Sequence, residues 1–560
     1  MSKLAMETSW ATHSVSNQYT ELADYNLFST DLVLKEYFEQ KNAQWATDIL
    51  QQTGHDIGTA WAYHQATLAN KHTPVLHTFD NRGNRRDVVE FHPAWHWFMK
   101  YAKNSGMISA PFESEQPHRW AFFGASFMLM SQVEDGSMCP TTMTQGAIPL
   151  IARESELWQL LKDKLLSHEY DERDLPIADK KSVWIGMGMT EKQGGSDVRA
   201  NQTIATPVGK SGRGQAYLLK GHKWFFSAPM CDAHLVVART SDTDALGCFF
   251  VPRWKFDGTK NAVQVQRLKD KVGNKSNSSS EVEFQDAWGI LMGEEGRGIP
   301  TIIEMANYTR LACVLGSAGI IRQATVQAIA YTRQRTAFGE KLYQQPLMRN
   351  VLVDFALESE AAQHLGLRLS EAFEADENDL SAKAWKRLVT PAAKYWTCKR
   401  AESLTAEAME VFGGNGYVDD GIMARLFREA PVNSIWEGSG NVMCLDVLRA
   451  VHKEPALVKV LLGELSQMAG GEAQILKAIA ALGQLFAAEP ALLEARARLL
   501  TEKLALIVQA CLMKQRAPEL MSAAFIDIRL GQPLAANYGA FISDNIHHES
   551  ILERSFPSVF

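Results

Sequence analysis

The sequence predicts an α+β fold in which a helical domain, a β domain and a helical bundle follow one another, with a further helical extension after the bundle. Two observations predict this order. Apolar residues recur at spacings of three and four in the first and last parts of the chain, as they do in amphipathic helices. Between these parts, short apolar runs alternate with Gly, Asp and Asn clusters, so strands are expected there.

The first domain is expected over residues 1–180. Helical signals run from Leu27 to about Ser167, and they include Trp-rich and Met-rich stretches such as Phe91 to Tyr101 and Phe122 to Val133. These signals predict an α-rich domain.

The middle domain is expected over residues 181–292. Its predicted strands are Tyr217 to Leu219, Leu235 to Ala238, Cys248 to Val251, Val263 to Arg267 and Glu281 to Phe284. Because no helical pattern separates these short strands, they predict a β-barrel or sandwich and not a series of βαβ units.

Helical spacing returns after Ile299 and predicts an antiparallel bundle over residues 293–453. Its clearest apolar stripes lie in Leu311 to Ile329, Val351 to Leu369 and Ala392 to Val411. These spacings of three and four place the apolar side chains on one face of each helix.

The extension, residues 454–560, also has a helical pattern. Pro490, Pro518 and Pro533 are expected to divide it into several helices. One apolar stripe contains Leu493, Leu500, Leu504, Ile507, Val508, Cys511 and Leu512.

Composition limits the classes of function. A net charge of −7 gives no overall attraction to nucleic acid or to anionic lipid, so any such binding must come from a local patch. Seven cysteines are scattered without a CxxC pair, which favours a reducing compartment. The N-terminus lacks a signal-peptide pattern, and no apolar run approaches the roughly 20 residues of a membrane span. We therefore expect a cytoplasmic protein without a membrane partner.

Several catalytic motifs are absent from the sequence. It contains no HExxH, no GxSxG and no His and Cys cluster with zinc spacing, so no metal site is expected. Gly186-Met187-Gly188 lacks a third glycine at the dinucleotide-fold spacing and lies among strands, which argues against a Rossmann fold.

Two distant segments carry the strongest chemical signal. Met189 to Asp197 follows an apolar stretch and turns through two glycines with hydroxyls and amides, which suits a backbone close to a polar cofactor. Ser434 to Asn441 places one acid, Glu437, in a turn bracketed by glycines behind a Trp. Together they predict a flavin site with a carboxylate base. Phe412 to Tyr417 either lines a pyrophosphate with its backbone N–H groups or simply ends a helix.

These segments together resemble the acyl-CoA dehydrogenase superfamily, whose members have an α-domain, a β-domain and a helical bundle in this order. The resemblance runs from about Phe91 to Arg449. Met187 to Asp197, Gly221 to Ser227 and Pro431 to Leu448 most resemble the alkylation-response branch of that superfamily, with which the likeness extends over nearly the whole chain.

The resemblance implies an FAD cofactor and assigns roles to particular residues. Thr190 would hydrogen-bond the flavin ring, and the segment Trp224 to Ser227 would form the wall behind it. Residues near Arg335 and Gly413 would reach the FAD of a neighbouring subunit, which implies a homotetramer. The cofactor-binding set is Met187, Gly188, Met189, Thr190, Gly195, Ser196, Trp224, Phe225, Phe226, Ser227, Arg335, Phe338, Gln345, Gly413, Gly414, Ile435, Trp436, Gly438, Ser439 and Asn441.

Glu437 matches the base that removes the α-proton of an acyl thioester in this superfamily. Burial beside an apolar flavin would raise its pKa toward the operating range. Taken alone, Glu437 is better explained as a turn carboxylate that caps the next helix. Two departures modify this interpretation. Lys192 and Gln193 replace the usual Pro-Gly of the turn near the substrate mouth, and Arg449 is a candidate to enter the substrate pocket and pair with Glu437.

The alkylation-response branch is associated with DNA binding. Residues 454–560 carry nine Lys and Arg against eleven Asp and Glu, so bulk charge does not mark the extension as a nucleic-acid module. Two local cationic sets remain, each equally explained as a solvated helix face. The first is the run from Lys383 to Arg400, with six cations and no acid; the second is Arg496, Arg498, Lys503, Lys514, Arg516 and Arg529.

Two hypotheses of function follow. The preferred one is an FAD-containing stress protein that binds double-stranded DNA non-specifically through phosphates and limits alkylation damage, with weak or vestigial acyl-CoA dehydrogenase activity. The alternative is a metabolic acyl-CoA dehydrogenase that acts on short or branched acyl-CoA, in which the extension serves only oligomer packing.

Overall fold

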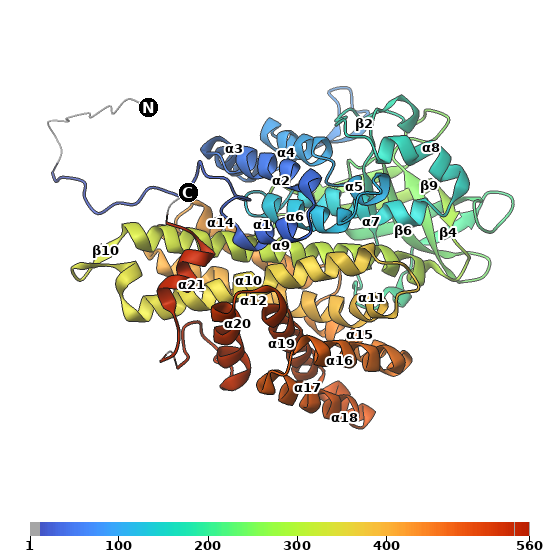
Figure 1. Cartoon of the computed structure of the whole chain (residues 1–560). Helices are drawn as coiled ribbons and strands as arrows, with labels where there is room; N and C mark the ends of the chain where they lie inside the picture. Colours follow the sequence, from blue (N-terminus) through green and yellow to red (C-terminus); the bar gives the residue numbers. More distant parts are fainter. Residues whose placement is uncertain (1–11, 543, 559–560) are drawn as a thin grey trace.

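The computed structural model describes residues 12–542 and 544–558. Its architecture confirms the expected α+β class: along the chain a β domain lies between two helical parts, and its strands lie together at one end of the molecule (Figure 1). The N-terminal helices are α1 (Leu32–Gln40), α2 (Gln44–Ile57), α3 (Ala60–Lys71), α4 (Pro93–Asn104), α5 (Ala110–Glu113), α6 (Arg119–Ser131), α7 (Met138–Ile151) and α8 (Ser155–Leu165). Helices α6 and α7 are buried on almost every face, which explains their unbroken apolar sequence.

A β-hairpin interrupts the N-terminal helices at a place where the sequence indicated none. Strands β1 (Val75–Phe79) and β2 (Arg85–Glu90) pair antiparallel around a turn in which Gly83 has φ of +81°. Arg85 of this hairpin donates from Nη2 to the carbonyl of Val265 at 2.9 Å. The hairpin therefore belongs to the interface with the β domain, and this tertiary contact was not visible in the local pattern.

The middle domain closes into a barrel. Its strands are β3 (Ile185–Gly188), β4 (Ile204–Pro207), β5 (Ala216–Phe226), β6 (Ala233–Thr240), β7 (Leu246–Pro252), β8 (Val263–Leu268) and β9 (Ser280–Met292). Pairing runs β6-β4-β5-β9-β7 and back to β6, with β3 added to β6 and β8 added to β9. The barrel has its own core, which includes Tyr217, Phe226, Phe249 and Phe284. All five predicted strand segments lie within these strands.

The bundle is built on one long helix. Helix α9 (Gly298–Gln334) packs against α6, α7, α10 (Pro346–Glu374), α12 (Thr390–Val411) and α14 (Ile422–Ile435), and α15 (Gly440–Lys453) follows α14. By length and composition α9 is apolar enough to cross a membrane, but its qualifying window is completely buried inside the fold. It is therefore the central core helix of the molecule.

The extension covers the bundle on the side away from α3 and α4 (Figure 1). It contains α16 (Pro455–Met468), α17 (Ala473–Phe486), α18 (Pro490–Ala495), α19 (Ala497–Arg516), α20 (Glu519–Ile526) and α21 (His548–Ser555). Helix α19 packs on α10 and α12. All seven residues of the predicted apolar stripe are buried there, from Leu493 to Leu512.

Arg554 in α21 joins three helices that are far apart in the sequence. Its guanidinium bonds both oxygens of Glu36 in α1, at 2.8 and 2.9 Å, and Glu360 in α10 at 2.9 Å. The Arg554 side chain is 9% exposed and that of Glu360 is 4% exposed. A buried carboxylate that loses its cation is strongly destabilising, so this contact fastens α21 to the N-terminal domain and the bundle together.

Arg554→Met is therefore expected to loosen α21. The opening free energy of the α21 amides, measured by hydrogen exchange, should fall by about 3 kcal/mol because Glu360 loses its cation. Lys383→Met removes a cation from an exposed position and should change the same amides by less than about 0.5 kcal/mol. Equal exchange of α21 in both variants would contradict the proposed clamp.

Candidate active site

A cavity of about 480 Å³ lies where the N-terminal helices, the barrel and the bundle meet. Helices α6, α7 and α9, the turn after β3, the end of β5 and the loop between α14 and α15 all contribute to it. The structure brings twelve of the predicted site residues to this cavity: Met187, Met189, Thr190, Gly195, Ser196, Phe225, Ser227, Ile435, Trp436, Glu437, Gly438 and Ser439.

Glu437 lies in a strained turn between α14 and α15. Its φ is +58° and that of Gly438 is +104°, both in the left-handed region. A non-glycine residue adopts this region at an energetic cost, and such residues concentrate at functional sites. Two cations hold the turn through its backbone: Arg310 Nε donates to the Glu437 carbonyl at 3.1 Å, and Lys394 Nζ donates to the Gly438 carbonyl at 2.8 Å.

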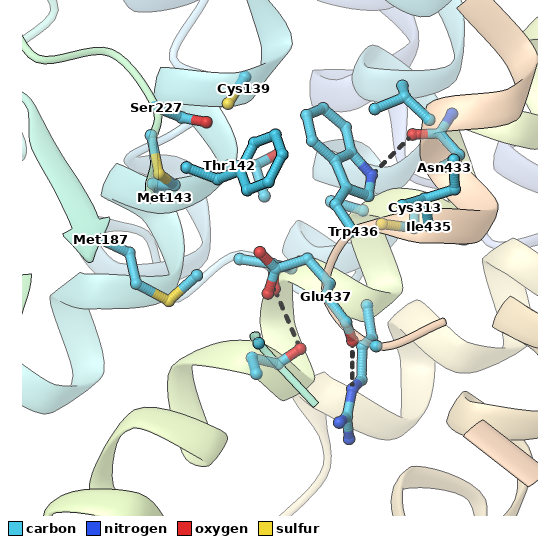
Figure 2. A pocket seen from close by; sticks show the side chains of 18 of the residues that line it. Cys139, Thr142, Met143, Met187, Ser227, Cys313, Asn433, Ile435, Trp436 and Glu437 are labelled. Atoms are coloured by element: carbon cyan, nitrogen blue, oxygen red, sulfur yellow. Dashed lines mark hydrogen bonds between the residues drawn. The ribbon is translucent and has the colours of Figure 1, made fainter. Parts of the chain in front are cut away.

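The Glu437 carboxylate faces the cavity, as Figure 2 shows. Thr309 Oγ1 donates a 2.5 Å hydrogen bond to its Oε2. Burial raises the pKa of Glu437 above its ordinary value, while the Thr309 hydrogen bond and the charges of Lys394 and Arg310 oppose that rise. A carboxyl group with a raised pKa in an enclosed cavity has the properties of a general base.

Arg449 does not enter the pocket, which corrects the prediction that it pairs with Glu437. It forms an ion pair with Asp446 at 3.0 Å, one helical turn earlier on α15, and its side chain is 56% exposed. The arginine that lines the cavity is Arg310, which is itself paired with Asp446 at 2.8 Å. Glu437 is therefore free of a direct guanidinium contact to its carboxylate.

Thr309, Arg310 and Lys394 were missed from the sequence. They lie in the long helices α9 and α12, and no local motif surrounds them. One signal was present: each is a polar residue that interrupts an apolar helical stretch. A buried Lys such as Lys394, with 1% exposure, must have partners to remain in place.

The opposite wall of the cavity fits an isoalloxazine ring. Phe225 is 54% exposed yet faces the cavity, and Ser227 and Thr190 place hydroxyls beside it. In Figure 2 Ser227, Met143 and Met187 lie across the cavity from Trp436. A Cβ on Gly195 would come within 2.5 Å of Thr190 Oγ1, so the glycine leaves room for that hydroxyl. An apolar face with hydroxyls at its edge matches a flat aromatic group with a polar rim.

Besides the five residues assigned to a neighbouring subunit, four predicted cofactor residues do not line the cavity. The pairing of β5 with β9 is irregular between Lys223 and Phe226, and at this point Phe225 and Ser227 reach the cavity while Trp224 and Phe226 do not. Phe226 lies in the barrel core and fills the space where a Cβ on Gly188 would stand, 2.7 Å away. Asn441 accepts a hydrogen bond from Arg498 instead of lining the cavity.

Lys192 and Gln193 do not line the cavity, although Gly195 and Ser196 of the same turn do, so their predicted position near the substrate mouth stays a prediction. Lys192 Nζ stands 5.5 Å from the centroid of the Trp224 ring, on the outer surface of the barrel. Gln193 Nε2 donates to Glu191 Oε2 and to the Ala200 carbonyl. The unusual turn sequence therefore changes the outside of the turn and leaves the cavity wall unaffected.

The residues assigned to a neighbouring subunit's FAD do not line this cavity. Phe338 is completely exposed at the tip of the hairpin β10–β11 (Thr336–Ala337 and Glu340–Lys341), and Gln345 Nε2 donates to Ala337. The hairpin projects from the end of the bundle (Figure 1). Arg335 bonds the Asn17 carbonyl, and a Cβ on Gly413 or Gly414 would meet no atom within 4 Å. Their role toward a second subunit stays a prediction.

The structure corrects much of the predicted basic face. Arg529 is buried between Asp354, at 2.5 Å, and Glu358, at 3.0 Å, so it cannot reach a DNA phosphate. Arg516 pairs with Glu371 and Lys514 with Glu519. Of the six cations that were predicted as a DNA-binding set in the extension, Arg496, Arg498 and Lys503 are exposed.

The run from Lys383 to Arg400 is not a free cationic face either. Lys394 is buried in the active-site turn, and Arg400 pairs with Glu358 at 3.0 Å. Arg387 pairs with Asp446 and Glu454. Within residues 12–542 and 544–558, no group of three or more His, Cys, Asp and Glu side chains is arranged to hold a metal ion.

Comparison with known proteins agrees with the fold and the cavity. Three family models match the chain: "Adaptive response protein AidB N-terminal domain" at residues 17–172, "Acyl-CoA dehydrogenase, middle domain" at residues 186–287 and "Acyl-CoA dehydrogenase, C-terminal domain" at residues 296–452. The chain is 43% identical over 546 residues to "Putative acyl-CoA dehydrogenase AidB" of Escherichia coli (strain K12), covering 97% of this chain and 98% of that protein.

Solved structures give the same result. Caenorhabditis elegans ACDH-11 in complex with C11-CoA has a TM-score of 0.84 at 25% identity, over 94% of each chain. An acyl-CoA dehydrogenase from Bacillus anthracis complexed with FAD shares the fold, with a TM-score of 0.62 at 18% identity over 78% of this chain and 81% of that chain.

The three-part fold and the enclosed cavity with its glutamate define an acyl-CoA dehydrogenase type of flavoprotein. The chain belongs to the acyl-CoA dehydrogenase family, as an AidB-like member. FAD is the cofactor that this membership implies.

The wall assignment predicts opposite outcomes for two neighbouring aromatics. Phe225→Ala should weaken FAD binding about tenfold or more because the ring loses its packing surface. Trp224→Ala should change FAD affinity less than about twofold, because that ring does not line the cavity. Titration of the apoprotein, followed by flavin fluorescence, measures both. A larger loss in Trp224→Ala than in Phe225→Ala would reverse the assignment.

Proposed function

We propose that this chain is an FAD-dependent oxidoreductase of the acyl-CoA dehydrogenase type that serves the response to alkylation and also binds DNA. The observation that carries the oxidoreductase part is Glu437, held by Thr309 in a cavity whose other wall is Phe225 and Ser227. The relative described as in complex with C11-CoA supports an acyl thioester as the substrate class. The AidB-like N-terminal domain supports the link to the alkylation response.

In the proposed reaction, Glu437 Oε2 or Oε1 accepts the proton from the α-carbon of the thioester. FAD, when bound, supplies the acceptor for the hydride that leaves the β-carbon, so that a carbon–carbon double bond forms. Thr309 fixes the carboxylate, while Arg310 and Lys394 fix its backbone. Burial of Glu437, Arg310 and Lys394 strengthens each of these electrostatic contacts, because the surroundings have a lower dielectric constant than water.

A second function has its own supporting observation. Arg449 turns away from Glu437, so nothing in the described residues places a guanidinium on the base. This favours full activity as a metabolic acyl-CoA dehydrogenase on short or branched acyl-CoA. In that case the extension contributes packing alone.

DNA binding is proposed through phosphate contacts of the cations that stay exposed on the extension. Arg496 and Lys503 flank the buried stripe of α19 and have no ion pair within the described residues. Such contacts are tolerant of sequence and weaken with salt. We further propose a homotetramer, in which the exposed hairpin that carries Phe338 meets a second subunit.

Glu437 predicts a defined pH dependence of anaerobic flavin reduction by short-chain acyl-CoA. The raised pKa keeps the carboxyl protonated at low pH, so the rate should increase as pH rises through that pKa. Glu437→Gln should lower the rate by about 10²–10⁴-fold. Thr309→Val removes a hydrogen bond that lowers the pKa, so its pH profile should move to higher pH.

Arg449→Ala is the matched control for this profile, because Arg449 pairs with Asp446 outside the cavity. Its profile should coincide with that of the unmodified protein. A shift in Arg449→Ala larger than that in Thr309→Val would mean that Arg449 does act on the base.

DNA binding is tested by titrating flavin-loaded protein with duplex DNA over a salt series. Arg496→Gln with Lys503→Gln should reduce the slope of log K against log salt by up to about two. Lys210→Gln with Lys220→Gln removes two exposed cations from the barrel and should leave the slope unchanged. No binding at low salt, together with rapid flavin reduction, would favour the metabolic function.

A further inference from the structure

A second polar region lies in the wall of the cavity, behind the Trp436 ring. Asp135, in the turn between α6 and α7, and Asn433, on α14, both line the cavity. Figure 2 shows Asn433 on the far side of Trp436 from Glu437, joined to the indole by a 3.0 Å hydrogen bond from Nε1 to Oδ1. Glu429 lies one turn earlier on α14, and its Oε1 accepts from the Asn274 backbone at 2.9 Å.

These side chains are almost fully buried, yet several of their polar atoms have no partner. Exposure is 7% for Asp135, 4% for Glu429, 2% for Asn433 and 1% for Asn274. Asn433 Nδ2, Glu429 Oε2 and both side-chain polar atoms of Asn274 lack a hydrogen bond within the described structure. Each such atom costs about 1–3 kcal/mol unless something binds it. Asn433 lines the cavity together with Asp135, whereas Glu429 and Asn274 do not, so the unpartnered atoms mark a polar region that reaches the cavity at Asp135 and Asn433.

The neighbouring Glu134 shows how a structural acid is satisfied in the same region. Its carboxylate accepts from Ser276 Oγ at 2.6 Å, from the Ser137 N–H at 2.7 Å and from the Gly136 N–H at 3.2 Å. Asp135 has two polar side chains beside it, Ser131 and Asn433, and Glu429 accepts from the Asn274 N–H at 2.9 Å. These donors are fewer than the three around Glu134.

The charges around the two acids do not balance. Arg425, the nearest buried guanidinium, donates to the Val133 carbonyl and to Thr67 instead of to a carboxylate. Lys271, which also lines the cavity, donates to the Asn277 carbonyl. Within the described residues neither Asp135 nor Glu429 has a cation within 4 Å. Burial and the charges of neighbouring acids raise the pKa of Asp135 to about 7 and that of Glu429 to about 8.

We propose that Asp135, supported by Glu429 and Asn433, recognises a positively charged group at the far end of the substrate, so that the preferred acyl chain carries an ammonium. This rests on the proposed acyl thioester chemistry at Glu437. A cation in the cavity would pair with Asp135, stabilise its ionised form and offset the nearby charge of Glu429. A hydrocarbon end would leave both carboxyl groups without a cation, which disfavours it.

The test compares substrates that differ only in this group. 4-Aminobutyryl-CoA and pentanoyl-CoA have the same length, and the first carries an ammonium where the second has a methyl. Pairs that are one carbon shorter and one carbon longer place the ammonium at other distances from the thioester. Dissociation constants are measured by perturbation of the flavin spectrum in FAD-loaded Glu437→Gln protein, in which turnover is blocked. We expect at least one amino thioester to bind tenfold or more tightly than its partner.

Asp135→Asn should reduce that ratio to below about two, and Glu429→Gln serves as the second variant if Asp135→Asn does not fold. Asp163→Asn, an exposed acid on α8, should leave the ratio unchanged. Equal affinity within every pair would overturn the proposal, as would equal preference for the corresponding hydroxyacyl-CoA, which carries no charge.

Failure of the proposed reaction is distinguishable from failure of this inference. If no thioester perturbs the flavin spectrum, the acyl thioester function is wrong, and butylammonium and butanol then test the cavity alone. Perturbation of the flavin spectrum by butylammonium at a concentration tenfold below that of butanol, lost in Asp135→Asn, would support the cation site. Equal effects of the two compounds would overturn it.

Discussion

The active site depends on two buried cations that bind backbone carbonyls. Lys394 reaches across from α12 to the carbonyls of Asn433 and Gly438, and Arg310 reaches from α9 to the carbonyl of Glu437. These bonds hold the turn between α14 and α15 in a conformation that a glutamate does not adopt readily. Without them the turn would relax, and the carboxylate would leave the position where Thr309 meets it.

The cavity exists because three separately built layers meet around α9. The N-terminal helices supply one apolar wall, the barrel supplies Phe225 and Ser227, and the bundle supplies the acid. The barrel is stabilised by its closed strand pairing and its own core, and the extension packs on the bundle through α19. On the bundle side of the site, Asp446 connects several helices, because it forms ion pairs with Arg310, Arg387 and Arg449.

The features that could be predicted from the sequence are those whose signal lies within a short stretch of the chain. The strand segments, the long helices and the two contiguous motifs around Thr190 and Glu437 carry their signals within about ten residues, and the structure places them as expected. The β1–β2 hairpin was missed because its strands are stabilised by contact with the barrel, as the Arg85 bond to Val265 shows. Trp224 and Phe226 were expected in the flavin wall but do not line the cavity, and a motif does not reveal that the strand is irregular at this point. Thr309, Lys394 and Asp135 come from elements distant in sequence, so only the fold unites them.

The backbone and the carboxylate of Glu437 are held by different residues, and this has an evolutionary consequence. Arg310 and Lys394 direct their hydrogen bonds to main-chain oxygens, and within the described residues the carboxylate itself accepts one hydrogen bond, from the hydroxyl of Thr309. The geometry of the turn therefore does not depend on the identity of the acid it presents. A lineage can therefore replace the reactive side chain while the protein stays folded. The same fold can then serve catalysis in one protein and a non-catalytic function in another, with the same core.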